Sequence, residues 1–386
     1  MFTLIYIIFA TAALAARLFL NEPDTGFDPF IPGGGGLTPL NEIFSLADFD
    51  ASARSYMSLR NYSYYRNGAA GEWSYRNNLE AFGRIRLRPR SLVDITHVEE
   101  SLPTSILGYN FSAPFFIAPA GRAGYGNPDA EKGLLRAGEA ANVLYIPSFG
   151  ATLPLEDIVA FKSPGNEYTT FQQLYIDNND TNVQSSLRRI ENAGQKAIIL
   201  TIDSPGDGAR SRAERYGVGS ADTGLTLLTW ERFSKILNMT SLPIVLKGIT
   251  TVEDARMAVS SGASAIYLSN HGGRQLDFSP SGFEVALEIH KQAPEIFDQI
   301  DVWADGGVRY GTDVLKLLAL GVKAVGLARP FMYANCYGED GVARAIDLLR
   351  TELINDSANL GLGDIKSINS SYLSLEYMNY NGWYTR

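Results

Sequence analysis

Cysteine, histidine and positive charge are all scarce in this chain, and each scarcity excludes a class of function. The 386 residues include one cysteine, Cys336, so an intrachain disulfide and a cysteine-based metal site are both excluded. There are three histidines, and no cluster of His, Asp and Glu has the spacing of metal ligands, which argues against metal chemistry. A net charge of -9 without a basic stripe argues against binding to nucleic acid or to an anionic membrane surface.

The first forty residues differ in composition from the rest of the chain. Residues 2–16 form an uncharged apolar run, which is short for a membrane span and typical of a signal-peptide core. We therefore expect residues 1–20 to be a signal peptide or a short membrane anchor; the anchor is the alternative because no Lys or Arg precedes the run and Arg17 follows it. Residues 21–40 are rich in Gly and Pro and predict a flexible linker.

Asn-X-Ser/Thr sequons favour a location in the secretory pathway or outside the cell, because this triplet is the acceptor for N-glycosylation. The sequons begin at Asn61, Asn110, Asn179, Asn238, Asn355 and Asn369. Together with the N-terminal run, they predict a glycoprotein that is secreted or held by a short N-terminal anchor.

From about residue 113, short apolar runs alternate with patterns of helical periodicity. The runs are residues 115–120, 144–148, 169–175, 197–203, 243–248, 265–270, 301–307 and 324–329. Helical patterns separate many of them, at residues 129–141, 182–193, 251–261, 281–292 and 311–320. Eight strands alternating with helices predict an α/β fold closed into a (β/α)8 TIM barrel. An open doubly wound sheet is disfavoured because no Gly-rich dinucleotide fingerprint follows the first run.

One folded unit is expected over residues 41–386. Its N-terminal helical extension covers residues 41–112, with helical patterns at 41–60 and 73–82 and a turn at 64–69. The barrel is expected at residues 113–350 and a C-terminal tail at 351–386.

Residues 269–277 read Ser-Asn-His-Gly-Gly-Arg-Gln-Leu-Asp and follow a buried apolar run. This one turn offers a base in His271, a fixed cation for a carboxylate in Arg274, and glycines that allow a close approach of backbone or ligand. His97 and His290 lack such neighbours and are expected to be ordinary surface or helix residues.

In a TIM barrel the active site lies at the carboxyl ends of the strands, so the residues that end each run are candidate site groups. They are Pro119, Ala120, Gly121, Ser148, Gln173, Tyr175, Thr201, Asp203, Lys247, Ser269, His271, Asp305, Gly306, Gly307 and Arg329. The last two strands end in Asp305-Gly306-Gly307-Val308-Arg309 and Ala328-Arg329-Pro330. Glycine amides and two guanidinium groups at these strands predict a phosphate site.

Four segments resemble the FMN-dependent α-hydroxy-acid oxidases and dehydrogenases, over about residues 41 to 370. They are the nonapeptide 269–277, the turn 305–309, the Phe-Gln-Gln-Leu-Tyr run 171–175 and the Leu-Thr-Ile-Asp-Ser-Pro run 200–205. The resemblance implies FMN as cofactor and oxidation of an L-2-hydroxy acid to the 2-oxo acid, with O2 as acceptor and H2O2 as product. A dehydrogenase with another electron acceptor is the alternative. The family also implies a homo-oligomer, a tetramer or an octamer.

The resemblance further implies a role for each matching residue. His271 would be the base and Asp203 would stabilise the imidazolium that forms. The substrate would be bound by Arg210, Arg274, Tyr64, Tyr175 and Gly121. Lys247 would supply positive charge beside the flavin. The cofactor would be bound by Pro119, Ala120, Gly121, Ser148, Gln173, Thr201, Lys247, Ser269, Asp305, Gly306, Gly307, Val308, Arg309, Ala328 and Arg329.

Two of these roles have close competitors in the sequence, and two glycines bear on the substrate. Arg212 and Arg215 lie near Arg210 in an expected loop at 211–224, and Tyr65 could exchange roles with Tyr64. Gly121 stands where many members of the family carry alanine. Gly150 stands where glycolate oxidases carry tryptophan. Unless Phe149 fills that space, we expect a substrate larger than glycolate or lactate.

Two other functions compete with this interpretation. An FMN barrel of the isomerase type would not need both Arg210 and Arg274 as a carboxylate clamp. A barrel that has lost catalysis and only binds a ligand would have lost its base and its phosphate site, and the sequence retains both.

Overall fold

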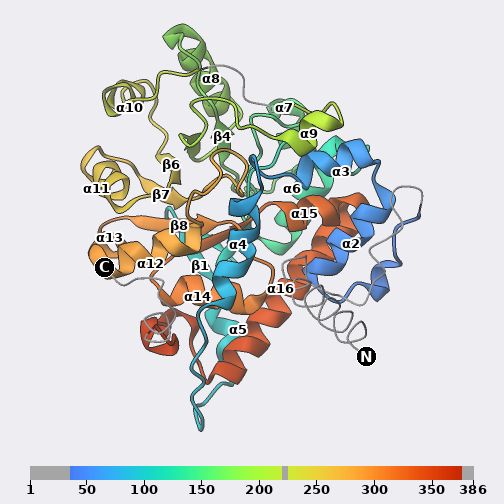
Figure 1. The fold of residues 1–386 in the computed structure, drawn as a ribbon, viewed down its shortest axis with the longest axis vertical. Helices are drawn as coiled ribbons and strands as arrows, with labels where there is room; N and C mark the ends of the chain where they lie inside the picture. Colours follow the sequence, from blue (N-terminus) through green and yellow to red (C-terminus); the bar gives the residue numbers. More distant parts are fainter. Residues whose placement is uncertain (1–34, 220–224, 376–386) are drawn as a thin grey trace, which may run out of the picture.

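The structure, a computed structural model, describes residues 35–219 and 225–375 (Figure 1). The expected signal peptide or anchor at residues 1–20 lies outside this part of the chain, as does most of the expected linker. Within the two described ranges, no helix combines the length and the hydropathy that crossing a membrane requires.

A parallel sheet forms the centre of the protein, and its strands follow the order β3-β9-β8-β7-β6-β5-β4. These strands are β3 (Phe115–Ile117), β4 (Gln172–Leu174), β5 (Ile198–Thr201), β6 (Ile244–Ile249), β7 (Ala265–Leu268), β8 (Asp301–Asp305) and β9 (Ala324–Leu327). The expected strand at 144–148 is reduced to single parallel bridges from Tyr145 to Ile117 beside β3 and to Thr170 beside β4. Those bridges close the circle, so the predicted (β/α)8 barrel is confirmed.

Helices cover the outside of the barrel because each crossover between parallel strands returns along the sheet surface. The helices that alternate with the strands are α6 (Lys132–Ala141), α7 (Leu155–Val159), α8 (Asp180–Asn192), α9 (Ser211–Arg215), α10 (Trp230–Leu237), α11 (Val252–Ser260), α12 (Gly282–Gln292), α13 (Ile296–Gln299), α14 (Gly311–Ala319) and α15 (Arg329–Ala334). Hydroxyl caps fix several starts, as where Thr251 accepts from the backbone of Asp254 and Ser281 from that of Glu284.

The C-terminal helix α16 (Glu339–Leu360) runs through residue 350, where the sequence placed the end of the barrel. Its buried side chains continue on both sides of that point, at Leu349 and Leu353, and pack against α6 and α14. The helix ends where Gly361 takes a left-handed conformation with φ of 67°. The first part of the expected tail is therefore a helix of the body.

The N-terminal extension consists of α2 (Leu46–Tyr56), α3 (Leu59–Tyr65), α4 (Trp73–Gly83) and α5 (Val98–Ser101), followed by a hairpin of β1 (Thr104–Ile106) and β2 (Tyr109–Phe111) (Figure 1). Tyr64 and Tyr65 belong to the last turn of α3, so the turn expected at 64–69 begins later than predicted. The reason is that the Ser58 side chain caps the start of α3 by accepting from the backbone N–H of Asn61. No proline interrupts residues 59–65, so the helix continues to Tyr65.

The loop expected at 211–224 is also partly wrong, because α9 occupies Ser211–Arg215. Short 3-10 helices complete the described chain at Leu40–Glu42, Ala123–Tyr125, Asn335–Tyr337, Ile365–Ser367 and Ser370–Tyr372.

Aromatic side chains fill the inside of the barrel. Phe171 and Trp303 stack with ring centres 6.2 Å apart, and Phe116 and Tyr267 contact each other edge to face. The barrel is therefore a packed core rather than a pore, and a ligand can approach the strands only at their ends.

Candidate active site

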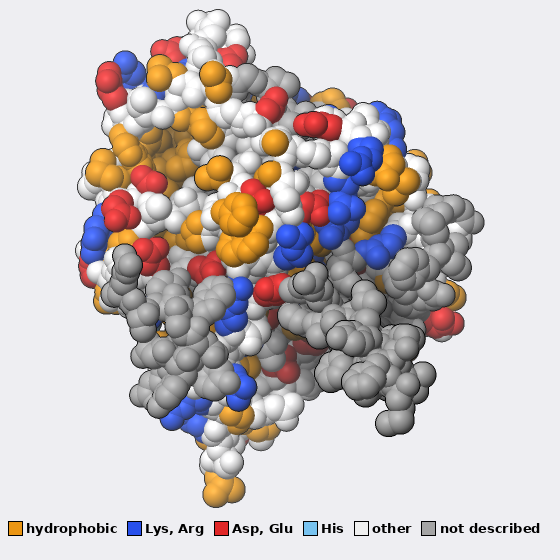
Figure 2. Space-filling view, viewed as in Figure 1, with side chains coloured by type: hydrophobic (Ala, Val, Ile, Leu, Met, Phe, Trp, Pro, Cys, Tyr) orange, Lys and Arg blue, Asp and Glu red, His pale blue; other side chains and the backbone are white. Residues whose placement is uncertain are grey.

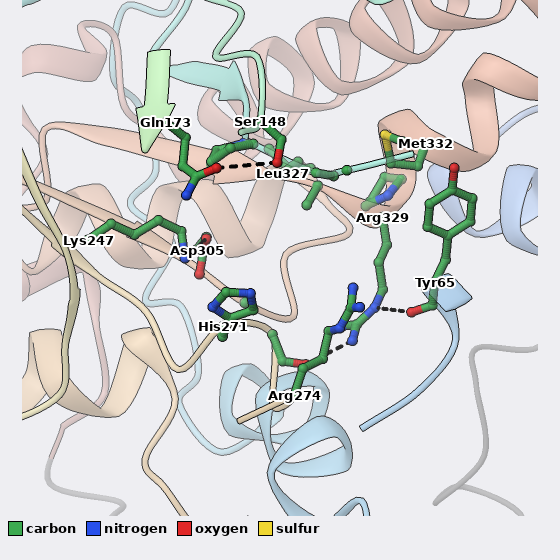
Figure 3. Close-up of a pocket in the computed structure, with 18 of the residues that line it drawn as sticks. Tyr65, Ser148, Gln173, Lys247, His271, Arg274, Asp305, Leu327, Arg329 and Met332 are labelled. Atoms are coloured by element: carbon green, nitrogen blue, oxygen red, sulfur yellow. Dashed lines mark hydrogen bonds and ion pairs between the residues drawn. The ribbon is translucent and has the colours of Figure 1, made fainter. Parts of the chain in front are cut away.

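A cavity opens at the carboxyl ends of the strands, as the barrel topology predicts (Figure 3). It holds about 960 Å³ of empty space, counting the part open to solvent. Its walls include these predicted site residues: Tyr64, Pro119, Ala120, Gly121, Ser148, Gln173, Tyr175, Thr201, Arg210, Lys247, His271, Arg274, Asp305, Gly306, Gly307, Val308, Arg309, Ala328 and Arg329. Ser269 and Asp203 contact members of this wall, Lys247 and His271 respectively. The cavity therefore brings together groups that are far apart in the sequence.

His271 is held by a short network of hydrogen bonds. Its Nδ1 lies 2.8 Å from Oδ1 of Asp203, and its backbone N–H donates to Oγ of Ser269 at 3.0 Å. The backbone of His271 is left-handed, with φ of 59°, which is a strained conformation for this residue. Because the Asp203 carboxylate accepts from Nδ1–H, Nε2 is the nitrogen free to take a proton, and it faces the Tyr175 hydroxyl at 3.3 Å.

The glycines of this turn are required by close contacts. A Cβ on Gly273, whose φ is 73°, would lie 2.4 Å from the backbone nitrogen of Tyr75. The turn thus packs directly against the start of α4, and this contact fixes where His271 stands.

Burial sets the protonation of the pair. Burial lowers the pKa of His271 below its ordinary value, against the opposing attraction of Asp203. Burial works to raise the pKa of Asp203, but the charges of His271 and Lys247 outweigh it and lower that pKa. At neutral pH the arrangement is an uncharged imidazole beside a carboxylate, which is the state that a general base needs.

Two guanidinium groups lie near His271. Arg274 stands over the ring of Tyr64 with its Cζ 5.1 Å from the ring centre, and its buried Nε has no hydrogen-bond partner among the described residues. Arg210 is 3% exposed and its Nε donates to the backbone oxygen of Arg274 at 2.9 Å. The sequence left Arg212 and Arg215 as competitors, but Arg212 pairs with Glu72 and Arg215 is exposed on α9. The structure therefore places Arg210 in the cavity.

The two neighbouring tyrosines are distinguished by their hydroxyls. The hydroxyl of Tyr65 donates to the backbone oxygen of Arg122 at 2.7 Å. The hydroxyl of Tyr64 faces Gly121, since a Cβ on that glycine would lie 3.1 Å from it. Tyr64 is therefore the one that can donate to a ligand beside His271.

Lys247 is buried at the base of the cavity with 4% exposure. Its Nζ donates to Oγ of Ser269 at 2.9 Å and lies 3.9 Å from a carboxylate oxygen of both Asp203 and Asp305. Figure 3 shows Lys247, Asp305 and His271 on the same side of the pocket. A buried ammonium group in this position is a fixed positive charge for an anionic ligand.

Arg309 and Arg329 also line the cavity. Arg329 donates to the backbone oxygens of Tyr65, Asn67 and Gly272, each at 2.9 Å, through Nε and NH2. Figure 3 shows the bond to Tyr65. NH1 of Arg329 makes none of these bonds. Burial lowers the pKa of Arg329 to about 10, so the group keeps its charge at neutral pH. Both residues line the cavity, and their role as a phosphate site stays a prediction.

These residues fit FMN. Ser148, Gln173 and Thr201 offer neutral hydrogen-bonding groups to a ring system, and Arg309 and Arg329 match a phosphate. Oδ1 of Asp305 is buried without a hydrogen-bond partner in the described chain, so it can accept from a sugar-alcohol hydroxyl. Gly306 and Gly307 also line the cavity.

The wall beside Tyr64 is made of backbone rather than side chains. Gly121 and Gly150 line the cavity, and a Cβ on Gly121 would lie 2.7 Å from the backbone oxygen of Gly150. Phe149 does not fill this space: it is 55% exposed and packs edge to face against Tyr175 with ring centres 6.1 Å apart.

Two pairs of contacts that position the site could not be assigned from the sequence. The amides of Asn78 and Asn270 bond each other twice, at 2.9 and 2.8 Å, and so tie α4 to the turn of His271. Glu72 binds Arg212 through both oxygens. An asparagine within the helical pattern 73–82 was the one available signal for the first pair, because asparagine is a weak helix former.

The other two histidines, His97 and His290, lie outside the cavity wall. His97 pairs with Glu100 on the surface, and Nδ1 of His290 lies 3.2 Å from the backbone oxygen of Leu320. Across residues 35–219 and 225–375, no group of three His, Cys, Asp or Glu side chains could hold a metal ion.

Comparison with known proteins shows similarity over nearly the whole described chain. A family model described as FMN-dependent dehydrogenase matches residues 53–227 and 220–375. L-lactate dehydrogenase (cytochrome) of Saccharomyces cerevisiae is 35% identical over 370 residues, which are 88% of this chain but 62% of the yeast protein. Glycolate oxidase 1 of Zea mays is 35% identical over 87% of this chain and 97% of its own length.

Solved structures give the same result. A flavocytochrome b2 variant with pyruvate bound has a TM-score of 0.83 and 35% identity, covering 90% of this chain and 93% of that one. Mandelate oxidase with benzoyl-formic acid has a TM-score of 0.78 and 33% identity, covering 86% of this chain and 98% of that one.

Proposed function

The chain belongs to the family of FMN-dependent dehydrogenases and oxidases that act on 2-hydroxy acids, and we propose that it oxidises an L-2-hydroxy acid bulkier than lactate, with O2 as the electron acceptor. The observation that carries this proposal is the pairing of His271 with Asp203 at 2.8 Å in the same cavity as Arg210 and Arg274. A base and a carboxylate anchor are the two protein groups that oxidation of a 2-hydroxy acid requires.

Arg210 and Arg274 hold the substrate carboxylate in this proposal. The buried Nε of Arg274 has no hydrogen-bond partner among the described residues, so it is a donor that a bound group can satisfy. A guanidinium pairs with a carboxylate through two parallel bonds. Tyr64 and Tyr175 donate to substrate oxygens from either side of His271. These contacts hold the substrate carbinol close to Nε2.

The substrate loses two electrons and two protons as the C–OH group becomes C=O. His271 takes one of the protons, and Asp203 stabilises the imidazolium that forms; the other proton and the two electrons would pass to bound FMN. FMN supplies the two-electron acceptor of the family's reaction when it is bound. Lys247 and the arginine pair Arg309 and Arg329 hold it by their charge.

The size of the substrate is proposed from the wall beside Tyr64. Gly121 and Gly150 contribute no side chain there, and Phe149 is turned to the surface. Each methylene group buried in an apolar pocket adds about 0.8 kcal/mol of binding. A substrate with a branched or aromatic side chain therefore gains affinity here that glycolate cannot gain.

A panel of acids tests these proposals together. Glycolate, L-lactate, L-2-hydroxyisocaproate and L-mandelate, each with its D enantiomer where one exists, are added without oxygen to the yellow protein, and bleaching of the flavin is timed. Peroxide is then measured in air. We expect faster bleaching by the two bulky L acids and one H2O2 for each 2-oxo acid formed. Rapid turnover of glycolate with none of the bulky acids would contradict the size proposal, and absence of peroxide would contradict O2 as acceptor.

We further propose that the protein enters the secretory pathway and forms a homo-oligomer. Five of the six sequon asparagines are exposed and Asn61 is half-buried, which supports glycosylation of the exposed five. Enzymatic deglycosylation of protein made in a eukaryotic host should lower its mass, and light scattering should give a tetramer or an octamer. An unchanged mass or a monomer would contradict the respective proposal.

A further inference from the structure

Glu72 occupies a strained position at the start of α4. Its backbone is left-handed, with φ of 59°, although the residue is not glycine. Its carboxylate accepts from the backbone N–H of Gly68 at 3.1 Å, and its side chain is 10% exposed. Strain of this kind persists where the surrounding structure requires it, and it often marks a position with a function.

The carboxylate of Glu72 reaches across to helix α9. Arg212 donates from Nε and NH2 to the two oxygens of Glu72, each at 2.8 Å, and Arg66 lies 3.4 Å from the second oxygen. The bonds from Arg212 have the paired geometry in which a guanidinium and a carboxylate bind most strongly. Burial works to raise the pKa of Glu72, but the bonds and charges of Arg212 and Arg66 lower it, so the pair is ionised at neutral pH.

Helix α9 buries few of its side chains. Within Ser211–Arg215 only Ala213 is buried. Figure 1 shows the helix beside α3 at the edge of the molecule, and one further backbone bond, from Ala70 to the oxygen of Ala209, lies just before it. Arg210, just before the helix, is tied to the turn of His271, because its Nε donates to the backbone oxygen of Arg274 and its NH2 donates to the side chain of Gln275. The segment is therefore kept in place by polar contacts on two sides, and those with the N-terminal extension include the pair of Glu72 and Arg212.

This segment carries Arg210, the residue that directly precedes α9 and lines the cavity. Arg212 is two residues further along, so a displacement of Arg212 moves the backbone of Arg210. We infer that Glu72 and Arg212 are positioning residues, whose ion pair holds the Arg210 guanidinium where the substrate carboxylate binds. The inference rests on the proposed role of Arg210 as a carboxylate clamp.

The surface around α9 agrees with an anionic ligand arriving there. Figure 2 shows Lys and Arg side chains gathered over α3 and α9, although the chain as a whole has a net charge of -9. Arg60, Arg212 and Arg215 are exposed in these two helices. Local positive charge of this kind raises the concentration of an anion near a site.

Binding of oxalate tests the inference, because oxalate presents a carboxylate to the clamp and needs no side-chain pocket. Its dissociation constant is measured from the change in flavin absorbance of the FMN-loaded protein. The variants are Glu72→Gln, Arg212→Ala, Arg212→Lys and the double variant Glu72→Gln/Arg212→Ala. Arg215→Ala is the matched control: it removes the same charge from the same helix, and Arg215 forms no ion pair within the described residues.

We expect Glu72→Gln and Arg212→Ala each to raise the dissociation constant of oxalate about ten-fold, since small displacements of a positioned group cost one to two orders of magnitude. The double variant should match the single variants, because both act through one ion pair. Arg212→Lys should give an intermediate value, and Arg215→Ala should bind oxalate like the parent protein. FMN content and melting temperature should change little in Arg212→Ala, since its side chain is 47% exposed.

Arg210→Ala separates the two ways in which this can fail. If it weakens oxalate binding while Glu72→Gln and Arg212→Ala do not, the positioning inference is overturned and the clamp stands. If Arg210→Ala also binds oxalate normally, the proposed clamp is itself wrong. Equal weakening by Arg215→Ala would show that net charge rather than position matters, and would overturn the inference as well. Should Glu72→Gln fold poorly, the comparison of Arg212→Ala with Arg212→Lys decides, because neither alters the start of α4.

Discussion

Replacement of Asp203 by asparagine is the sharpest test of how the base is supported. The carboxylate lies 2.8 Å from Nδ1 of His271, and its other oxygen lies 3.9 Å from Nζ of Lys247. Asp203→Asn keeps the shape of the side chain and removes the negative charge that stabilises an imidazolium. It also offers His271 an amide in place of a carboxylate, so the tautomer with Nε2 free is no longer fixed.

The size of the effect follows from Coulomb's law. Two unit charges about 4 Å apart interact by about 4 kcal/mol at an effective dielectric constant of about 20. Loss of that stabilisation in the transition state corresponds to a fall of about a thousand-fold in rate, since about 1.4 kcal/mol is a factor of ten. We expect the limiting rate of anaerobic flavin reduction to fall by roughly this factor while the dissociation constant of oxalate changes little.

Asp305→Asn is the matched control for this experiment. Asp305 lies at the same 3.9 Å from Lys247, and no hydrogen bond joins it to His271 in the described structure. Its variant should bind FMN less tightly and, once loaded, should reduce its flavin within about ten-fold of the parent rate. If Asp203→Asn retained the parent rate, or if the two variants slowed reduction equally, the assignment of Asp203 to the base would be refuted.

Three further predictions concern pH, packing and stability. Because burial lowers the pKa of His271, a pH–rate profile should show kcat/KM rising with pH and levelling off with an apparent pKa below about 6.5. A plateau that starts above pH 8 would contradict this. Gly121→Ala would set a methyl group 2.7 Å from the backbone oxygen of Gly150, so it should lower the free energy of unfolding by about 1–3 kcal/mol, measured by denaturant melts. It should also slow the oxidation of bulky acids more than that of glycolate, measured with the acid panel. Burial raises the pKa of Asp313 to about 6, so its ionisation disfavours the folded state as pH rises from about 4 to about 6. Asp313→Asn should therefore stabilise the protein at pH 7.5, by up to about 3 kcal/mol, and leave it unchanged at pH 4; no gain at pH 7.5 in chemical denaturation would contradict the burial argument.

The fold and the place of the site could be predicted because, in a (β/α)8 barrel, strands that follow one another in the sequence are neighbours in the barrel and end on the same face. Each apolar run is buried on both faces and therefore reads as a strand, and the polar residue that ends it must lie at the common end of the barrel. Thr201 and Lys247, for example, are 46 residues apart in numbering and directly paired in the sheet. The run at 144–148 departs most, because it forms single bridges at Tyr145. Most of the other strands are a few residues shorter than their apolar runs.

The contacts that position the site could not be predicted in the same way. Glu72 and Arg212, and Asn78 and Asn270, meet across the boundary between the N-terminal extension and the barrel, and no periodicity relates such pairs. Helix α3 extends to Tyr65 because Ser58 caps it, which decides which tyrosine hydroxyl faces the cavity. A side chain's partner is fixed by packing between elements, and that packing leaves no local pattern in the sequence.

The most direct measurement is the rate at which an L-2-hydroxy acid bleaches the flavin of a His271→Gln variant without oxygen. The variant must first be shown to hold FMN and to bind oxalate like the parent protein. Because general base catalysis contributes about 10²–10⁴-fold, we predict a loss of at least a hundred-fold in the limiting rate. A variant that bleached as fast as the parent would show that the imidazole is not the base, and the account of this site would be wrong.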